Sequence, residues 1–233
     1  EEFRRALIVG APTKAGSIQG ETAAFESNAV KPVWKFACED EVRGSVTVAV
    51  DEDMVLVPSY DHNIYALDRE TGKFKWKYPT EAGIVSKPWV SEGMVVFGSI
   101  DKVVYAVDVK TGRLLWTTPT QGRIYSSPYG ELGHIFIGSD DRQIYAIHQM
   151  SGRRAWTYAA DGEIRSRPLV AENLILFACQ MGVVYALSLN RELRWRFRAR
   201  RGFLAAPVMA NGLIFIGSLD TNFYAVDVRS GWA

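Results

Sequence analysis

The chain has 233 residues, of which 48% are hydrophobic and 12% aromatic; this argues against a disordered protein and is ordinary for a globular one. Lys and Arg total 27 against 26 Asp and Glu, so the formal net charge of +1 gives no overall attraction to nucleic acid or to a membrane surface. The two cysteines, Cys38 and Cys179, lie far apart without metal-ligand spacing, which argues against a disulfide framework or a zinc site and favours small buried side chains.

The chain is organised as repeats of about 40 residues. Residues 65–76 read YALDRETGKFKW, and related segments begin 40, 40, 40 and 39 residues further on, at Tyr105, Tyr145, Tyr185 and Tyr224. A tryptophan recurs with nearly the same spacing, at Trp34, Trp76, Trp116, Trp156 and Trp195. A period of this length with no helical segment inside it is typical of propeller blades or of other stacked arrays.

Within one period the apolar pattern predicts four short strands. In the unit 83–122 we expect an inner strand over 84–90, two buried strands over 94–98 and 103–107, and an outer strand over 114–117. The units then span approximately 3–42, 43–82, 83–122, 123–162, 163–202 and 203–233, the first without its inner strand and the last without its outer one.

The sequence therefore predicts an all-β fold: one β-propeller domain over 1–233, built from about six four-stranded antiparallel blades with the first and last incomplete. The alternative is a part of a seven- or eight-bladed propeller.

The recurring polar and aromatic residues are interpreted as structural. Asp61, Asp101, Asp141 and Asp220 lie in a hairpin after the second strand, where a short carboxylate accepts turn N–H groups. Asp68, Asp108 and Asp227 come just before a Thr-Gly or Ser-Gly pair, whose glycine supplies a positive φ. Each repeated tryptophan is expected to bury its ring between neighbouring blades, because one sheet cannot cover its own apolar faces.

The pattern Tyr-Ala-Leu-Asp-x-x-Thr-Gly-x-x-x-Trp, followed by Ser-x-Pro and Gly-Ser, resembles the PQQ-like β-propeller repeat over nearly the whole chain. The resemblance implies the fold and leaves the function open. That superfamily includes quinoprotein alcohol dehydrogenases, the lipoprotein subunit of the bacterial β-barrel assembly machinery, and extra-catalytic domains of bacterial Ser/Thr kinases.

The dehydrogenases of the family carry an adjacent-cysteine disulfide over the quinone and a Ca²⁺ held by Glu and Asn beside a catalytic Asp. Cys38 and Cys179 do not match that pattern, and no aspartate outside the repeated turns lies in a convincing catalytic setting. We therefore expect no catalytic residue, no cofactor and no metal. A PQQ-dependent dehydrogenase or its relic stays as one alternative, and an envelope assembly scaffold resembling the β-barrel assembly lipoprotein as another.

Departures from the repeat indicate two candidate binding surfaces. The loops between blades and after the second strand open on one face, which gathers residues that differ from blade to blade: Arg43, Tyr60, His62, Lys102, Arg123, Tyr125, Asp140, Arg142, Arg165, Gln180 and Met181. The second surface is a basic strip in the fifth unit: Arg194, Arg196, Arg198, Arg200 and Arg201. It favours either an acidic or phosphate-bearing partner or a charged outer strand that resists aggregation.

The leading interpretation is a non-catalytic propeller that serves as a protein-, peptide- or small-ligand-binding sensory or scaffold module of a larger, bacterial signalling or assembly protein. Its expected partner is another protein, a peptide or another domain of the parent chain. Nucleic acid is not expected, because no dominant positive field exists. Membrane insertion is not expected either, because no apolar run approaches about 20 residues. The amino terminus does not resemble a signal peptide, so a cytoplasmic location is favoured; a periplasmic one stays open if a signal segment has been removed.

Overall fold

A computed structural model of the protein describes residues 31–233. The chain divides into two compact units, Glu1–Lys35 and Phe36–Ala233. All the strands of the described residues belong to the second unit, whose architecture follows.

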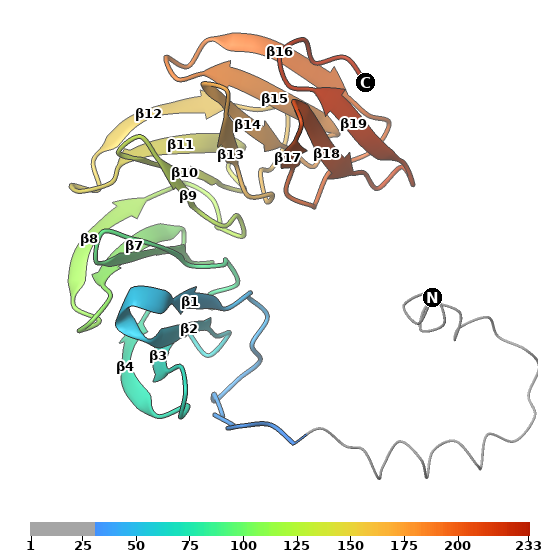
Figure 1. The fold of residues 1–233 in the computed structure, drawn as a ribbon. Helices are drawn as coiled ribbons and strands as arrows, with labels where there is room; N and C mark the ends of the chain where they lie inside the picture. Colours follow the sequence, from blue (N-terminus) through green and yellow to red (C-terminus); the bar gives the residue numbers. More distant parts are fainter. Residues whose placement is uncertain (1–30) are drawn as a thin grey trace, which may run out of the picture. The chain divides into compact units, whose positions relative to one another are not determined.

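Five antiparallel sheets succeed one another along this unit, and in each of them every strand pairs with the next strand of the chain (Figure 1). Sheet 1 contains β1 (Thr47–Ala49), β2 (Met54–Pro58), β3 (Asn63–Asp68) and β4 (Phe74–Pro79), and the 3-10 helix η1 (Val50–Glu52) connects β1 to β2. Sheet 2 contains β5 (Trp89–Ser91), β6 (Met94–Gly98), β7 (Val103–Asp108) and β8 (Leu114–Pro119). Sheet 3 contains β9 (Tyr129–Glu131), β10 (His134–Gly138), β11 (Gln143–His148) and β12 (Arg154–Ala159). Sheet 4 contains β13 (Leu169–Ala171), β14 (Leu174–Ala178), β15 (Val183–Ser188) and β16 (Leu193–Arg198). Sheet 5 contains β17 (Val208–Ala210), β18 (Leu213–Gly217) and β19 (Phe223–Asp227).

The predicted propeller blades are confirmed, as five sheets where about six units were expected. In the first predicted unit, the segments 6–10 and 23–26 lie outside the described residues, and 31–46 holds no strand. Sheet 5 has three strands among the described residues, in agreement with the predicted lack of an outer strand in the last unit.

The inner strands are shorter than the sequence predicted. The expected strand over 84–90 begins only at Trp89, because the residues before it bond elsewhere. The N–H of Ile84 donates to the carbonyl of Ser59 in sheet 1, at 3.0 Å. The hydroxyl of Ser86 accepts from the N–H of Gly98 at 3.0 Å and donates to its carbonyl at 2.9 Å. At the end of β6, the Ser86 hydroxyl thus makes the hydrogen bonds that the backbone of a neighbouring strand would otherwise make. The serine of the Ser-x-Pro pattern therefore specifies a side-chain hydrogen bond to the backbone of β6.

The hydrophobic core of the unit consists of clusters that each lie between two neighbouring sheets. Between sheets 2 and 3, for example, Val96 and Ala106 of one sheet pack with Ile135 and Ile147 of the next. The inner strands β1, β5, β9 and β13 contact one another in that order. Every sheet is therefore stabilised chiefly by its neighbours along the chain, as in other stacked repeats.

The repeated tryptophans tie one sheet to the next. Trp76, Trp116 and Trp195 are buried, with 7–9% of their surface exposed, and each donates its indole N–H to a backbone carbonyl of the following sheet at 2.8–2.9 Å. Under the ring lies the glycine of the Thr-Gly or Ser-Gly turn of that sheet. At Gly152, which has a φ of +68°, an added Cβ would lie 2.7 Å from the Trp116 ring. The glycine thus meets two demands, a left-handed turn and contact with a ring.

A second link between sheets consists of an aspartate and a tyrosine. Asp141 accepts the hydroxyl hydrogen of Tyr145 at 2.7 Å and the N–H of Gln121, in the loop from the preceding sheet, at 2.8 Å. The same arrangement recurs at Asp61, Asp101 and Asp220. Sheet 4 has Met181 at this position, and there the hydroxyl of Tyr185 accepts from the N–H of Asp161 at 2.9 Å. The recurring aspartates are engaged in holding the fold.

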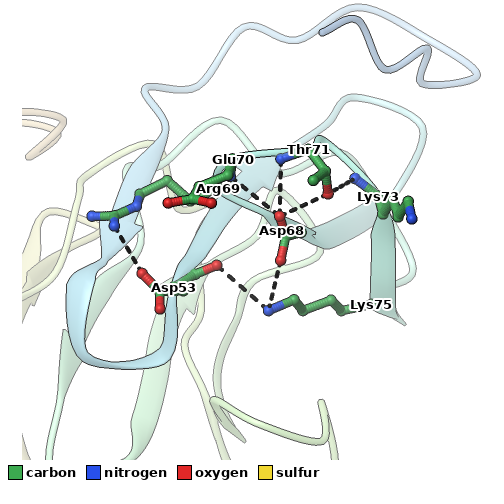
Figure 2. Close-up of polar contacts among 7 residues, drawn as sticks. All are labelled: Asp53, Asp68, Arg69, Glu70, Thr71, Lys73 and Lys75. Atoms are coloured by element: carbon green, nitrogen blue, oxygen red, sulfur yellow. Dashed lines mark hydrogen bonds and ion pairs between the residues drawn. The ribbon is translucent and has the colours of Figure 1, made fainter. Parts of the chain in front are cut away.

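Asp68 shows the other repeated turn (Figure 2). Its carboxylate accepts the hydroxyl of Thr71 at 2.7 Å and the N–H groups of Glu70 and Thr71, and its second oxygen lies 3.3 Å from the Lys75 Nζ. The hydroxyl of Thr71, its N–H group and Lys75 lower the pKa of Asp68 to about 2, against the opposing effect of desolvation. Asp108 and Asp227 make the same bonds within their turns.

The lowered pKa values of the turn aspartates predict that the folded protein loses stability in acid. The pKa of Asp68 and that of Asp220 are both about 2, below the value of about 3.9 in an unfolded chain. Their stabilising effect is present above about pH 4 and is lost as the pH falls through 2. The denaturant midpoint should therefore decline steadily from pH 5 to pH 2. A midpoint that is constant down to pH 2.5 would show that these bonds do not stabilise the folded state.

Candidate partner-binding surfaces

The structure brings four of the predicted loop residues together on one face, across sheets 3 and 4. Arg165, in the loop before β13, donates from Nε and Nη2 to both oxygens of Asp140 at 2.8 and 2.9 Å. Its guanidinium lies over the Tyr125 ring, 4.5 Å from the centroid. The side-chain amide of Gln180 is satisfied when its oxygen faces Arg165, and in that orientation the oxygen accepts from Arg165 Nε at 3.1 Å. The four residues come from the loops between blades and the loops after the second strand, the two sets that the sequence predicts on one face.

Hydrogen bonding to Asp140 raises the pKa of Arg165 despite its partial burial, so the guanidinium is charged at every ordinary pH. The Nε and Nη2 donors of this guanidinium already bond the Asp140 carboxylate, and this leaves few donors for a ligand. The cluster is thus better suited to joining sheets 3 and 4 than to gripping an anion.

The other predicted loop residues stand apart from this cluster. Arg43 is exposed, stacks on Tyr60 at 4.4 Å and pairs with Glu41 in the segment before β1. His62, Lys102 and Arg142 occupy the left-handed position of their turns, with φ of 67–74°, and their carbonyls accept an N–H from the end of the outer strand. These three side chains are exposed, and their turn geometry explains their common place in the repeat.

Two predicted residues in the remaining loops are also exposed. The carbonyl of Arg123 accepts the N–H of Asp140 at 2.9 Å, while its side chain faces solvent. Met181 has 57% of its surface exposed and packs against Gly162. Sequence reasoning missed Arg167, whose guanidinium lies 4.8 Å from the centre of the Tyr129 ring, because the contact depends on the register of two inner strands.

The basic strip lies on β16, the outer strand of sheet 4, and in the segment that follows it, which holds Arg200 and Arg201. Arg194, Arg196 and Arg198 are exposed along one side of the strand, while Trp195 is buried and Phe197 half-buried on the other, as their alternation predicts. Arg194 pairs with Glu192 at 3.1 Å and Arg198 with Asp161 at 2.6 Å. Among the described residues, Arg196 and Arg201 have no carboxylate within 4.0 Å.

The described residues do not fit a quinone and calcium site of the dehydrogenase type. Cys179 is fully buried in the core between sheets 3 and 4, and Cys38 lies in a different part of the unit, so neither has a partner for an adjacent disulfide. Within residues 31–233, no three His, Cys, Asp or Glu side chains converge as metal ligands would. The same part of the chain contains no helix with the length and apolar character that crossing a bilayer requires.

Trp34 lies in the first unit, Glu1–Lys35, half-buried and outside any strand. Trp156 is in β12 but differs from the three buried tryptophans, since it is only half-buried. The shared spacing therefore does not give all five rings the same environment.

This architecture is similar to that of several known proteins. A family model described as outer membrane protein assembly factor BamB matches residues 19–127 and 117–200. The crystal structure of BamB from Moraxella catarrhalis is similar, with a TM-score of 0.77 and 18% identity over 85% of this chain and 65% of that one. The computationally designed Ika8 protein gives a TM-score of 0.71 and 16% identity over 80% of this chain and 59% of its own.

A further similar structure is the quinohemoprotein alcohol dehydrogenase ADHIIG from Pseudomonas putida HK5, with a TM-score of 0.71 and 15% identity over 85% of this chain and 42% of that one. The chain spans less than two thirds of each of these three structures. At such identities the likeness shows the fold alone. No curated protein matches the sequence.

Proposed function

Since this chain belongs to the BamB-type family of PQQ-like β-propeller repeats, we propose that it is a non-catalytic binding module whose partner is a protein with an acidic surface. The observation that carries the proposal is the arginine strip on β16 and in the segment just after it. It occurs in one blade of the five, so it is not needed for the repeat to fold.

The repeated polar side chains support a non-catalytic role. The aspartates, tyrosines, tryptophans and serines that recur in the blades bond to neighbouring strands and turns. Every buried side-chain nitrogen or oxygen of the described residues has a hydrogen-bond partner. A polar group held in this way stabilises the fold and is not free to act on a substrate.

The charge on the strip suits an acidic protein partner. Arg196 and Arg201 are exposed and lack carboxylate partners among the described residues, so an incoming Asp or Glu can pair with them without displacing an existing ion pair. Guanidinium groups bind carboxylates through two parallel hydrogen bonds. Since the whole chain has a net charge of only +1, the attraction would be local to this strand.

The strip can be tested with a simple acidic probe, a 20-residue glutamate polymer, by fluorescence anisotropy at low and high salt. We expect the double variant Arg196→Glu with Arg201→Glu to weaken binding at least tenfold, and 0.3 M salt to weaken wild-type binding similarly. The control is Lys77→Glu, which makes the same charge change per site at the matching position of β4. Equal affinity for the double variant and the wild type would rule the strip out.

A scaffold for outer membrane protein assembly is a second candidate, favoured by the description of the matching family. In that case, loss of the protein from its cell should lower the amounts of β-barrel proteins in the outer membrane. Quinone-dependent alcohol oxidation by the purified protein would instead overturn the non-catalytic proposal.

A further inference from the structure

The junction between sheets 3 and 4 lacks the tryptophan link found at the other junctions. Trp156 of β12 is half-buried, and its indole N–H has no acceptor among the described residues. At the other three junctions the corresponding N–H donates to a carbonyl of the next sheet, at Val109, Gln149 and Val228.

The cause is a shortened turn in sheet 4. The turn between β15 and β16 is closed by a bond from the N–H of Ser188 to the carbonyl of Glu192 at 2.8 Å, with Arg191 at a φ of +70°. The other sheets place a glycine, such as Gly152, under the preceding tryptophan ring. Sheet 4 has no glycine in this turn, and the space that the longer turn would fill stays open beside Trp156.

Two leucines replace a polar contact at the same junction. Between sheets 2 and 3, Glu92 accepts from the side chain of Gln149 at 3.0 Å, and between sheets 4 and 5, Glu172 accepts from Arg229 at 2.7 Å. Both pairs join residues 57 apart. The equivalent pair between sheets 3 and 4 is Leu132 and Leu189, and Leu132 has 61% of its surface exposed.

These departures converge on one pocket of about 220 Å³, lined by Leu132, His134, Phe136, Trp156, Leu189 and Asn190. Half of its lining residues carry aromatic rings: the Phe136 and Trp156 rings lie 6.0 Å apart between centroids, and Phe136 and His134 lie 6.2 Å apart. The volume is below the roughly 300–1,000 Å³ of sites for whole small molecules. It is of the size that accepts a single side chain.

We propose that this pocket binds one leucine or phenylalanine side chain of an acidic protein segment, and that a backbone carbonyl of the segment accepts the indole N–H of Trp156. A buried apolar anchor beside a satisfied hydrogen bond is the usual centre of a protein interface. The proposal rests on the proposed function, because it identifies the segment of the partner that the arginine-bearing blade holds.

The surroundings of the pocket favour an acidic segment over a neutral one. The adjoining hollow, of about 420 Å³, shares Leu189 and Asn190 with the pocket and includes Arg194. It is also lined by Glu172, whose carboxylate is already paired with Arg229 at 2.7 Å. From the short turn into β16, Arg191, Arg194 and Arg196 are exposed against the single carboxylate of Glu192. A segment with its anchor in the pocket would thus have acidic neighbours within reach of these arginines.

The test uses two synthetic octapeptides of Asp and Glu that differ only in a central Leu or Ala. Titration of the folded protein is followed by the NMR signal of the Trp156 indole N–H, assigned with Trp156→Phe. We expect the Leu peptide to shift this signal and to bind at least tenfold more tightly than the Ala peptide. Asn190→Trp should block the pocket and abolish this preference. Its control is Lys110→Trp, the matching position of sheet 2, where the glycine already lies under the ring.

The outcomes separate the pocket from the strip. Equal binding of both peptides, lost in the Arg196→Glu and Arg201→Glu variant, overturns the pocket and supports the strip. A Leu preference that survives this double variant supports the pocket, and if the affinity for both peptides is also unchanged, the result overturns the role of the strip. An unchanged Leu preference in Asn190→Trp, or no binding of either peptide, overturns the pocket.

Discussion

Replacing Trp116 with alanine is expected to lower the free energy of unfolding by about 3–5 kcal/mol, the range for deleting a buried large aromatic side chain. The ring is 8% exposed, lies over Gly152 and donates to the carbonyl of Gln149 at 2.8 Å, so its loss opens a cavity and leaves a carbonyl without its donor. Denaturant unfolding followed by circular dichroism measures the change.

Trp156→Ala is the matched control, because the two tryptophans stand at the same position of consecutive sheets. Trp156 is half-buried and makes no indole hydrogen bond to the described residues, so we expect a loss at least about 1 kcal/mol smaller than for Trp116. Equal losses in the two variants would mean that the hydrogen bond and the glycine contact contribute little to the junction.

Gly152→Ala is expected to destabilise the protein by about 2–5 kcal/mol. A residue with a side chain at a φ of +68° is strained by roughly 1–2 kcal/mol. The new Cβ would also lie 2.7 Å from the Trp116 ring, and overpacking typically adds about 1–3 kcal/mol. The melting temperature and the denaturant midpoint should both fall.

Gly133→Ala isolates the contribution of the ring. Gly133 has a similar φ of +72°, but an added Cβ there meets no atom within 4 Å. Only the backbone strain should remain, about 1–2 kcal/mol. If the two alanine variants lose the same stability, the tryptophan contact at Gly152 is not restrictive, and the turn alone explains the glycine.

The blades could be predicted from the sequence because their marks repeat. β6 lies where the apolar run predicted it, over Met94–Gly98, and the alternation in β16 places its arginines outside. The inner strand over 84–90 was predicted too long, since a pattern of residue types does not reveal that the Ser86 hydroxyl bonds the end of β6 in place of the backbone. Propensity describes a strand, but not which groups its backbone bonds.

The candidate sites were predicted less fully, for a related reason. The sequence showed departures from the repeat in the fifth unit, residues 163–202, where the interval between tyrosines shortens to 39. The effect of the missing residue falls on Trp156, one blade earlier. A repeat pattern aligns equivalent positions within each blade, whereas the pocket is lined by Leu132 of sheet 3 and Leu189 of sheet 4, from two sides of a junction. The length of the turn was the available signal, since the Gly that lies under Trp76 and Trp116 is absent from the turn that follows Trp156.

The links between neighbouring sheets also determine where the stack of sheets separates under force. In a stack where each layer touches only its neighbours, failure begins at the least-coupled interface. Between sheets 3 and 4 the tryptophan hydrogen bond and the carboxylate of the Asp–Tyr link are both missing. Among the polar contacts that remain, the Arg165–Asp140 pair is partly exposed and open to screening by salt. Pulled from its ends, the molecule should separate there first, into a block of three sheets and a block of two, and high ionic strength should lower the force required.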